Sequence, residues 1–168
     1  VERLCKTYNI PLYIEHFNTK EYASQQRISI EMAARDLRYA WFNRLLDENK
    51  GDKVAIAHHR DDNIETLILN LARGTGLKGL TGIQPLNGKI IRPLLCISRD
   101  DIESYLGSLK QSYVTDSTNL EDEFARNKVR IHIIPALEEI NSACKNNIQN
   151  TIGYLNEIQV IYNKAIEE

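Results

Sequence analysis

The sequence lacks paired cysteines, long apolar runs and a secretion signal. Its three cysteines, Cys5, Cys96 and Cys144, lie far apart and form no Cys-x-x-Cys pair, which argues against a disulfide framework, a zinc ribbon and an iron–sulfur site. No apolar run is long enough to span a bilayer, and the first residues lack the basic start and the cleavage site of a signal peptide. These absences predict a cytoplasmic protein with no membrane partner.

An excess of positive charge is also absent. The 168 residues carry 21 Lys and Arg against 23 Asp and Glu, a formal charge of −2. Such a chain has no general positive field to hold nucleic acid, so any RNA contact has to come from a local patch. With 42% hydrophobic residues, the chain can bury one sizeable core, beside which a second full domain would be small.

Along the first half, apolar residues alternate between the spacing of helices and that of strands. Helical spacing covers residues 1–9, 29–51 and 62–74, and short apolar runs typical of strands cover 12–17 and 53–57. Ser29 is the expected N-cap of the clearest helix, and Gly51 follows that helix. The alternation predicts an α/β fold with an open, mostly parallel sheet and helices on both faces.

The second half differs in character. A loop is marked by four glycines: Gly74, Gly76, Gly79 and Gly82. Residues 89–95 are predicted as a strand, 98–109 as a helix capped by Ser98, and 111–119 as extended chain. From about Phe124 the pattern is helical, and Pro135 either kinks that region or starts a new helix.

Titratable side chains crowd into residues 56–76, where a predicted strand ends and a helix begins. In an open α/β sheet, ligands bind at this edge. Asp61 as N-cap, with Glu65 one turn later, would be a purely structural arrangement. Helical spacing, however, stacks Asp61 and Asp62 above Glu65. Like charges repel, so a metal ion, an arginine or a cationic substrate is expected between them. The core-facing stripe is expected to be Ile64, Leu67, Ile68 and Leu71.

Four motifs follow one another in the order found in one enzyme family: SIEMAARDLRY, AHHRDDNIETLILNLARGTGLKGL, IIRPLL and DSTNLEDEFARNKVRIHIIPAL. Over about residues 1–140, the chain resembles the tRNA(Ile)-lysidine synthetases, which are PP-loop ATP pyrophosphatases. The second motif is shared with other PP-loop enzymes that modify tRNA, whereas TDSTN followed by RNKVR is more particular to lysidine synthetases. The resemblance implies an adenine nucleotide alpha hydrolase-like α/β domain over 1–120 and a helical, tRNA-contacting segment over 121–168.

One element of that family is absent. The chain has no Ser-Gly-Gly-x-Asp-Ser loop, which in the family cradles the phosphates of ATP, and no Gly-Gly pair. This loop and the first strand would precede Val1, which stands where a methionine would begin a complete chain. The resemblance therefore predicts a chain truncated at both ends, which binds ATP poorly and is inactive alone, while its parent carries the activity.

The resemblance implies ligation of free L-lysine to C2 of the wobble cytidine in the CAU anticodon of tRNA(Ile). ATP adenylates the C2 oxygen with release of pyrophosphate, and the ε-amine of lysine then attacks C2 and expels AMP. The anticodon changes from reading AUG to reading AUA. The implied cofactors are ATP and Mg²⁺, and the implied partners are tRNA(Ile) and L-lysine. The sequence leaves a homodimer open.

The acidic residues suit a pocket for lysine. Asp62 and Glu65 are expected to bind its ammonium groups, and a carboxylate or His59 to accept the proton that the ε-amine loses. Asp61 is the candidate ligand of Mg²⁺, which binds carboxylate and phosphate oxygens together. A buried histidine without a catalytic role is the alternative for His58 and His59.

The triphosphate requires cations or backbone donors. The candidates for nucleotide binding are Arg35, Arg38, His58, Arg73 and Gly74. An exposed helix pair with Glu31 would explain Arg35 equally well. Arg73 is equally explained as a cation at a helix C-terminus and Gly74 as a turn residue.

Contact with tRNA is expected from Arg126, Asn127 and Arg130. On a helix the two arginines share a face at i, i+4, a spacing suited to phosphates or a flipped base, and Asn127 would read a base edge. The alternative is a solvated face that answers the acidic residues 121–123.

Three other functions stay open. A PP-loop tRNA thiolase normally carries cysteine pairs, which are absent here. A metal-dependent phosphoesterase would use the HHRDD segment as its metal cluster. A non-catalytic nucleotide- or RNA-binding fragment is the alternative for this chain taken by itself.

Overall fold

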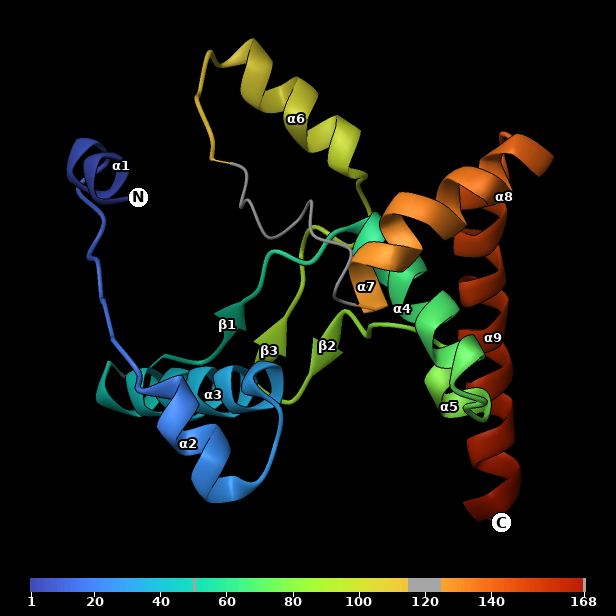
Figure 1. The fold of residues 1–168 in the computed structure, drawn as a ribbon, viewed down its shortest axis with the longest axis horizontal. Coiled ribbons are helices and arrows are strands. Elements are labelled where there is room, and N and C mark those ends of the chain that lie inside the picture. Colours follow the sequence, from blue (N-terminus) through green and yellow to red (C-terminus); the bar gives the residue numbers. More distant parts are fainter. Residues whose placement is uncertain (50, 115–124, 168) are drawn as a thin grey trace. The chain divides into compact units, whose positions relative to one another are not determined.

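A computed structural model describes residues 1–49, 51–114 and 125–167 of the chain (Figure 1). The chain divides into two compact units, Val1–Val54 (unit 1) and Ala55–Glu168 (unit 2). Among the described helices, none is long and apolar enough to cross a membrane.

Unit 1 is helical. It contains α1 (Glu2–Thr7), α2 (Thr19–Gln26) and α3 (Ile30–Glu48), and α2 packs against α3. The Ser29 hydroxyl accepts the Met32 N–H at 3.2 Å, which confirms Ser29 as the N-cap of α3. After the helix, the Gly51 N–H returns to the Leu46 carbonyl at 2.8 Å.

The strand predicted over 12–17 is not formed. Tyr13 donates from its hydroxyl to Asn49 Oδ1 at 2.7 Å, and Glu15 accepts from Arg44 at 2.9 Å. These side-chain contacts hold an extended segment, but within the described residues its backbone pairs with no strand. A strand exists only through the hydrogen bonds of a neighbouring strand, so apolar alternation alone was insufficient.

The sheet is small: two of its strands lie within the predicted strands 53–57 and 89–95, whereas the strand at 86–87 was not predicted. It consists of β1 (Val54–Ala55), β2 (Leu86–Asn87) and β3 (Ile90–Ile91), in the order β1-β3-β2. β2 and β3 form an antiparallel hairpin around Gly88, whose φ is +57°. The α/β class is confirmed, although the predicted strand 89–95 ends early because the chain turns at Pro93.

Unit 2 is built around α4 (Arg60–Ala72), with α5 (Leu77–Leu80) and α6 (Arg99–Ser108) following along the chain. Its core contains Ile64, Val129 and Ile134. Ile64 and Leu67 are buried as expected, whereas Leu71 is 64% exposed and does not belong to the core stripe.

The start of α4 differs from the predicted arrangement. His59, not Asp61, is the N-cap, and the Asp62 carboxylate accepts the His59 N–H at 3.0 Å. Asp62 occupies the third helical position, from which a carboxylate reaches back to the cap residue. At the start of α6, the Ser98 N–H donates to the Asp101 carboxylate and the Asp101 N–H donates to the Ser98 hydroxyl. Ser98 is thus confirmed as the N-cap.

The C-terminal part is helical, as predicted. It contains α7 (Ala125–Lys128), a π-helical turn η2 (Val129–Ile133), α8 (Ile134–Ile140) and α9 (Cys144–Glu167). Pro135 lies in the first turn of α8, so it starts a helix rather than kinking one. α4 contacts α7, η2 and α9 (Figure 1), so these C-terminal helices share one compact unit with α4. A domain boundary near residue 120 stays a prediction. Most of the predicted extended segment 111–119 lies outside the described residues.

Candidate functional site

The candidate site lies where β1 leads into α4. Two backbone hydrogen bonds hold this junction against β3 and the chain that follows it: the Ile56 N–H donates to the Ile91 carbonyl and the Arg60 N–H to the Ile97 carbonyl, each at 2.9 Å. Residues 56–60 and 91–97 therefore run beside each other. This pairing brings the two histidines and the first turn of α4 close to side chains that are distant in sequence.

Carboxylates surround His59. Its Nδ1 lies 3.6 Å from Asp61 Oδ2, and its Nε2 lies 3.5 Å from Asp62 Oδ2. Asp61 raises the pKa of His59 most; partial burial opposes this effect, and the charges of Asp62 and Glu65 add to it. The site therefore favours the imidazolium form of His59.

Asp61 is held as an anion. Contact with His59 lowers the pKa of Asp61 to about 2; burial opposes this shift, while the Arg99 backbone N–H and the charge of Lys145 support it. The Arg99 N–H donates to Asp61 Oδ2 at 2.8 Å. Asp61 thus ties the start of α6 to the start of α4.

Glu65 makes the strongest ion pair of the cluster. Its side chain is 1% exposed and accepts two hydrogen bonds from Arg130, from Nε at 2.7 Å and from Nη2 at 3.0 Å. Arg126 lies further away, with Nε 3.7 Å from Glu65 Oε2, and donates to Thr66 Oγ1 at 2.9 Å. Asp62 Oδ1 is 4.0 Å from both guanidinium groups. The sequence predicted a metal ion, an arginine or a cationic substrate between these acids. The structure places two arginines there, Arg126 and Arg130.

A cavity of about 230 Å³ opens beside this cluster. It is lined by His59, Asp61, Glu65, Arg99, Asp100, Arg130, Ile134, Pro135, Glu138 and Lys145. Lys145 Nζ lies 3.0 Å from Glu138 Oε1. Partial burial lowers the pKa of Lys145, but Glu138, with Asp61 and Asp100, outweighs burial, so the pKa is raised. The cavity thus already accommodates one ammonium group among carboxylates.

His58 has a different environment from its neighbour. Its Nδ1 accepts a hydrogen bond from Arg92 Nε at 3.1 Å, and Arg92 is itself only 7% exposed. Arg92 also donates from Nη1 to the Gln84 carbonyl at 2.6 Å. A guanidinium therefore connects the β1–α4 junction to the loop that follows α5.

Comparison with known proteins identifies the fold. A model of the PP-loop domain matches residues 1–137. The chain belongs to the PP-loop family. Among solved structures, this PP-loop chain is similar to the U34-tRNA thiolase NcsA from Methanococcus maripaludis with its [4Fe-4S] cluster. The TM-score is 0.69 at 24% identity, over 93% of this chain and 54% of that one. At this identity the likeness concerns the fold alone.

Two curated relatives of the PP-loop chain carry the same name. The chain is 53% identical over its whole length to a tRNA(Ile)-lysidine synthase of Bacteroides thetaiotaomicron and 45% identical over 97% of its length to one of Parabacteroides distasonis. The resemblance noted from the motifs is thereby confirmed. The chain spans 39% and 37% of the lengths of these two relatives.

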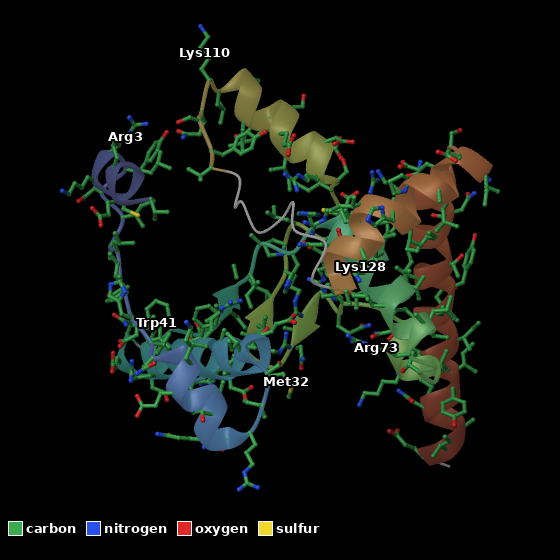
Figure 2. The ribbon with its side chains drawn as sticks, in the orientation of Figure 1. Arg3, Met32, Trp41, Arg73, Lys110 and Lys128 are labelled. Carbon is green, nitrogen blue, oxygen red and sulfur yellow. The ribbon has the colours of Figure 1, made fainter. Side chains whose placement is uncertain are left out.

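The PP-loop residues predicted to bind nucleotide fall in three places. Arg35 and Arg38 belong to α3 in unit 1 and are exposed; Arg35 lies over the Tyr39 ring at 4.8 Å, and no ion pair joins it to Glu31 within the described chain. Arg73 ends α4 as an exposed side chain (Figure 2), and Gly74 follows it with φ +70°. His58 lies at the other end of α4.

The predicted tRNA contacts differ in exposure. Side-chain exposure is 40% for Arg126 and 27% for Arg130, whereas Asn127 is buried at 7%. Lys128 on the same short helix is exposed (Figure 2). The TDSTN part of the motif lies outside the described residues. A role in tRNA binding stays a prediction for all three residues.

The described residues of the PP-loop chain contain no group of three His, Cys, Asp or Glu arranged to hold a metal ion. The carboxylate of Asp61, the predicted Mg²⁺ ligand, already accepts the Arg99 N–H with one of its oxygens. A Mg²⁺ ion at Asp61 would depend on phosphate oxygens for most of its ligands, which is the usual way that Mg²⁺ binds with nucleotides.

Sequence reasoning missed Arg92, Arg99, Asp100, Glu138 and Lys145. Arg92 had a local signal, because IIRPLL places an arginine inside an apolar run, where a charge requires a partner. Lys145 had no such local signal, because it lies in the first turn of α9 and its neighbours in the sequence do not distinguish it from other lysines at helix starts. Only the packing of α8 and α9 in the unit built around α4 brings Glu138 and Lys145 to the cavity.

Proposed function

We propose that this chain forms the catalytic core of a tRNA(Ile)-lysidine synthase. The reaction joins the ε-amine of free lysine to C2 of the wobble cytidine in the CAU anticodon. The cytidine C2 oxygen first attacks the α-phosphorus of ATP and pyrophosphate leaves; the amine then attacks C2, loses a proton, and AMP departs with the C2 oxygen. The observation that carries this proposal is the similarity to curated lysidine synthases along the entire chain, with 53% identity to one of them.

The charge of the site supports lysine as the amine. Asp62 and Glu65 at the start of α4 lie within 4.0 Å of the guanidinium groups of Arg126 and Arg130, and Asp61 and Asp62 lie within 3.6 Å of His59. An ammonium group would join these charge-assisted contacts between carboxylates and cations. The cavity that already receives the Lys145 ammonium has the chemistry for a second one.

Asp62, which lies beside the cavity and not in its lining, is the better candidate for contact with the ammonium group of lysine. Its Oδ1 lies 4.0 Å from each guanidinium, beyond hydrogen-bond distance, whereas both oxygens of Glu65 accept hydrogen bonds from Arg130. Glu65 would contact lysine only if one of its carboxylate oxygens accepted from lysine and Arg130 together. The base that takes the amine proton would be one of these carboxylates or His59, whose pKa is raised mainly by Asp61.

The other roles follow the same chemistry. ATP would be bound by His58, Arg73 and Gly74, with Mg²⁺ at Asp61, and the predicted contribution of Arg35 and Arg38 to nucleotide binding would come from unit 1. Arg126 is more exposed than Arg130, so it is the better candidate for a phosphate of tRNA(Ile). Asn127 would read a base edge only after its buried side chain moved.

The lysine role is tested in a protein of the relatives' length that contains these residues. Asp62→Asn keeps the shape of the side chain and removes its charge. The lysine requirement should rise roughly 10- to 100-fold, the loss expected for one charge-assisted hydrogen bond, while pyrophosphate release without lysine persists. Asp52→Asn, an exposed carboxylate of unit 1, is the matched control.

Two results would contradict that assignment. Normal lysine dependence with failed pyrophosphate release would move Asp62 to the metal, particularly if added Mg²⁺ restored the first step. Unchanged kinetics in both steps with lowered stability would leave Asp62 as a helix cap only.

A tRNA thiolase is the second candidate, because the motif AHHRDDNIETLILNLARGTGLKGL is shared with other PP-loop enzymes that modify tRNA. Mass spectrometry of tRNA modified by the full-length protein separates the two, since ligation of lysine and replacement of oxygen by sulfur change the nucleoside mass differently. The three separated cysteines favour ligation.

A further inference from the structure

Arg92 is a buried cation outside the acidic cluster. Its side chain lies after β3, 7% exposed, and its backbone N–H donates to the Pro85 carbonyl at 2.9 Å. Burying a guanidinium is costly unless its donors are satisfied. The Nη1 donor meets a carbonyl, that of Gln84 at 2.6 Å, and the Nε–H meets the ring nitrogen of His58 at 3.1 Å.

The direction of this last hydrogen bond fixes the state of the imidazole. A guanidinium carries only donors and stays protonated in proteins, so Nδ1 of His58 has to be the acceptor. An imidazole whose Nδ1 accepts carries its proton on Nε2. The contact is therefore compatible with one neutral tautomer and excludes both the other tautomer and the imidazolium.

A polar network keeps Arg92 in place. Gln84, whose carbonyl accepts from Arg92, donates from Nε2 to Asn156 Oδ1 at 2.9 Å and to the Thr81 carbonyl at 3.1 Å. Asn156 donates to the same Thr81 carbonyl at 3.1 Å. The loop that holds Arg92 is thereby attached to α9.

We propose that Arg92 is a positioning residue that holds His58 as the neutral tautomer protonated on Nε2. This inference rests on the proposed function only for its consequence in catalysis. There, His58 takes part in nucleotide binding as a neutral ring and not as a base, because Arg92 occupies the nitrogen that could take a proton.

Long-range ¹H–¹⁵N NMR of the histidine rings in the 168-residue chain tests the tautomer directly. In the wild-type chain, His58 should show an unprotonated Nδ1 and a protonated Nε2 at neutral pH. Arg92→Met removes the donor but keeps an apolar stem, so both tautomers should populate and the two nitrogen shifts should converge. Arg44→Met, which removes an exposed guanidinium of unit 1, should leave them unchanged.

A second pair of variants covers the case in which Arg92→Met fails to fold. The Oδ1 of His58→Asn can replace Nδ1 as the acceptor, whereas His58→Leu leaves the buried Nε–H unpaired. His58→Leu should therefore melt roughly 3 °C or more below His58→Asn. Equal melting temperatures, a protonated Nδ1 in the wild-type chain, or an unchanged tautomer in Arg92→Met would each overturn the proposal.

The catalytic consequence has its own readout in a protein of the relatives' length. Arg92→Met should slow pyrophosphate release roughly tenfold, the effect of one lost hydrogen bond, with the lysine requirement unchanged. A changed lysine requirement with normal pyrophosphate release would overturn the catalytic part. If the tautomer is observed but no lysine is ligated to tRNA, the proposed function fails and the positioning by Arg92 stands.

Discussion

Two adjacent histidines occupy opposite electrostatic environments. His58 accepts from a guanidinium, while His59 lies within 3.6 Å of one carboxylate and 3.5 Å of another. The first environment requires a neutral ring, and the second favours a charged one. Adjacent positions in a strand-to-helix junction point in different directions, so sequence proximity does not imply a shared role. The His58 side, with Arg92 and the loop 81–84, and the His59 side, with the carboxylates of α4, can be perturbed separately.

The largest effect is expected on the His59 side, from Glu65→Gln. The change leaves Arg130 facing a neutral amide in a site where Glu65 is 1% exposed. The free energy of unfolding should fall by about 3 kcal/mol, the low end of the range for broken buried pairs, because Arg130 keeps some contact with water. Urea unfolding measures it. Glu15→Gln, which breaks the exposed pair with Arg44, should cost less than about 1 kcal/mol, and equal costs would contradict the prediction.

On the His58 side, Gly82→Ala should be the next most damaging change. Gly82 has φ +67°, and a Cβ there would meet Asn63 Oδ1, which accepts the Ile83 N–H at 2.6 Å. Left-handed strain and the displaced hydrogen bond together should cost about 2 to 3 kcal/mol.

Gly74→Ala is the matched control for that change. Gly74 has φ +70°, but a methyl group there would meet open space, so only the strain of about 1 kcal/mol remains. Thermal unfolding of the two variants in parallel gives the difference. A Gly74 variant as unstable as the Gly82 variant would mean that crowding at Asn63 has no effect.

Acid should weaken the His59 side through Asp61. Because its folded pKa of about 2 lies below the ordinary value of 3.8, Asp61 stabilises the fold above about pH 4, and this contribution is lost as the pH falls toward 2. Partial exposure limits the contribution to about 1 to 2 kcal/mol. Asp61→Asn should remove it, so the stability difference between the wild-type chain and the variant should shrink on acidification. ¹³C NMR titration of the Asp61 carboxyl gives the pKa itself.

The smallest effect is expected at alkaline pH, from His59. Its folded pKa is raised, so the ring contributes stability below its ordinary pKa of 6.5 and loses that contribution as the pH rises through the folded value. His59→Gln should therefore be more destabilising near about pH 6 than near about pH 9. A pH-independent cost would indicate that the ring contributes only packing.

Local signals predicted the helices with clear start residues, such as α3 and α6, but not the shorter α2, and they predicted the long-range contacts poorly. Ser29 and Ser98 mark helix starts through hydrogen bonds that span only three residues, so the sequence contains the whole interaction. The pairs Glu65–Arg130 and His58–Arg92 join residues 65 and 34 positions apart, which no local pattern encodes. The sequence did indicate that the acids of α4 needed a positive partner, because their repulsion is a local property, but it did not indicate which arginine supplies it.

The π-helical turn η2 lets the chain hold one additional residue without turning α8. A π turn holds one residue more than an α turn, and η2 contains Arg130 and precedes Pro135 and Glu138 on the cavity wall. Deleting a single residue from η2 would restore an ordinary α-helix, and α8 would keep nearly the same rotation relative to α7. A natural one-residue length difference at this point would therefore change the residues of η2 around Arg130 while the side chains of α8 still line the cavity.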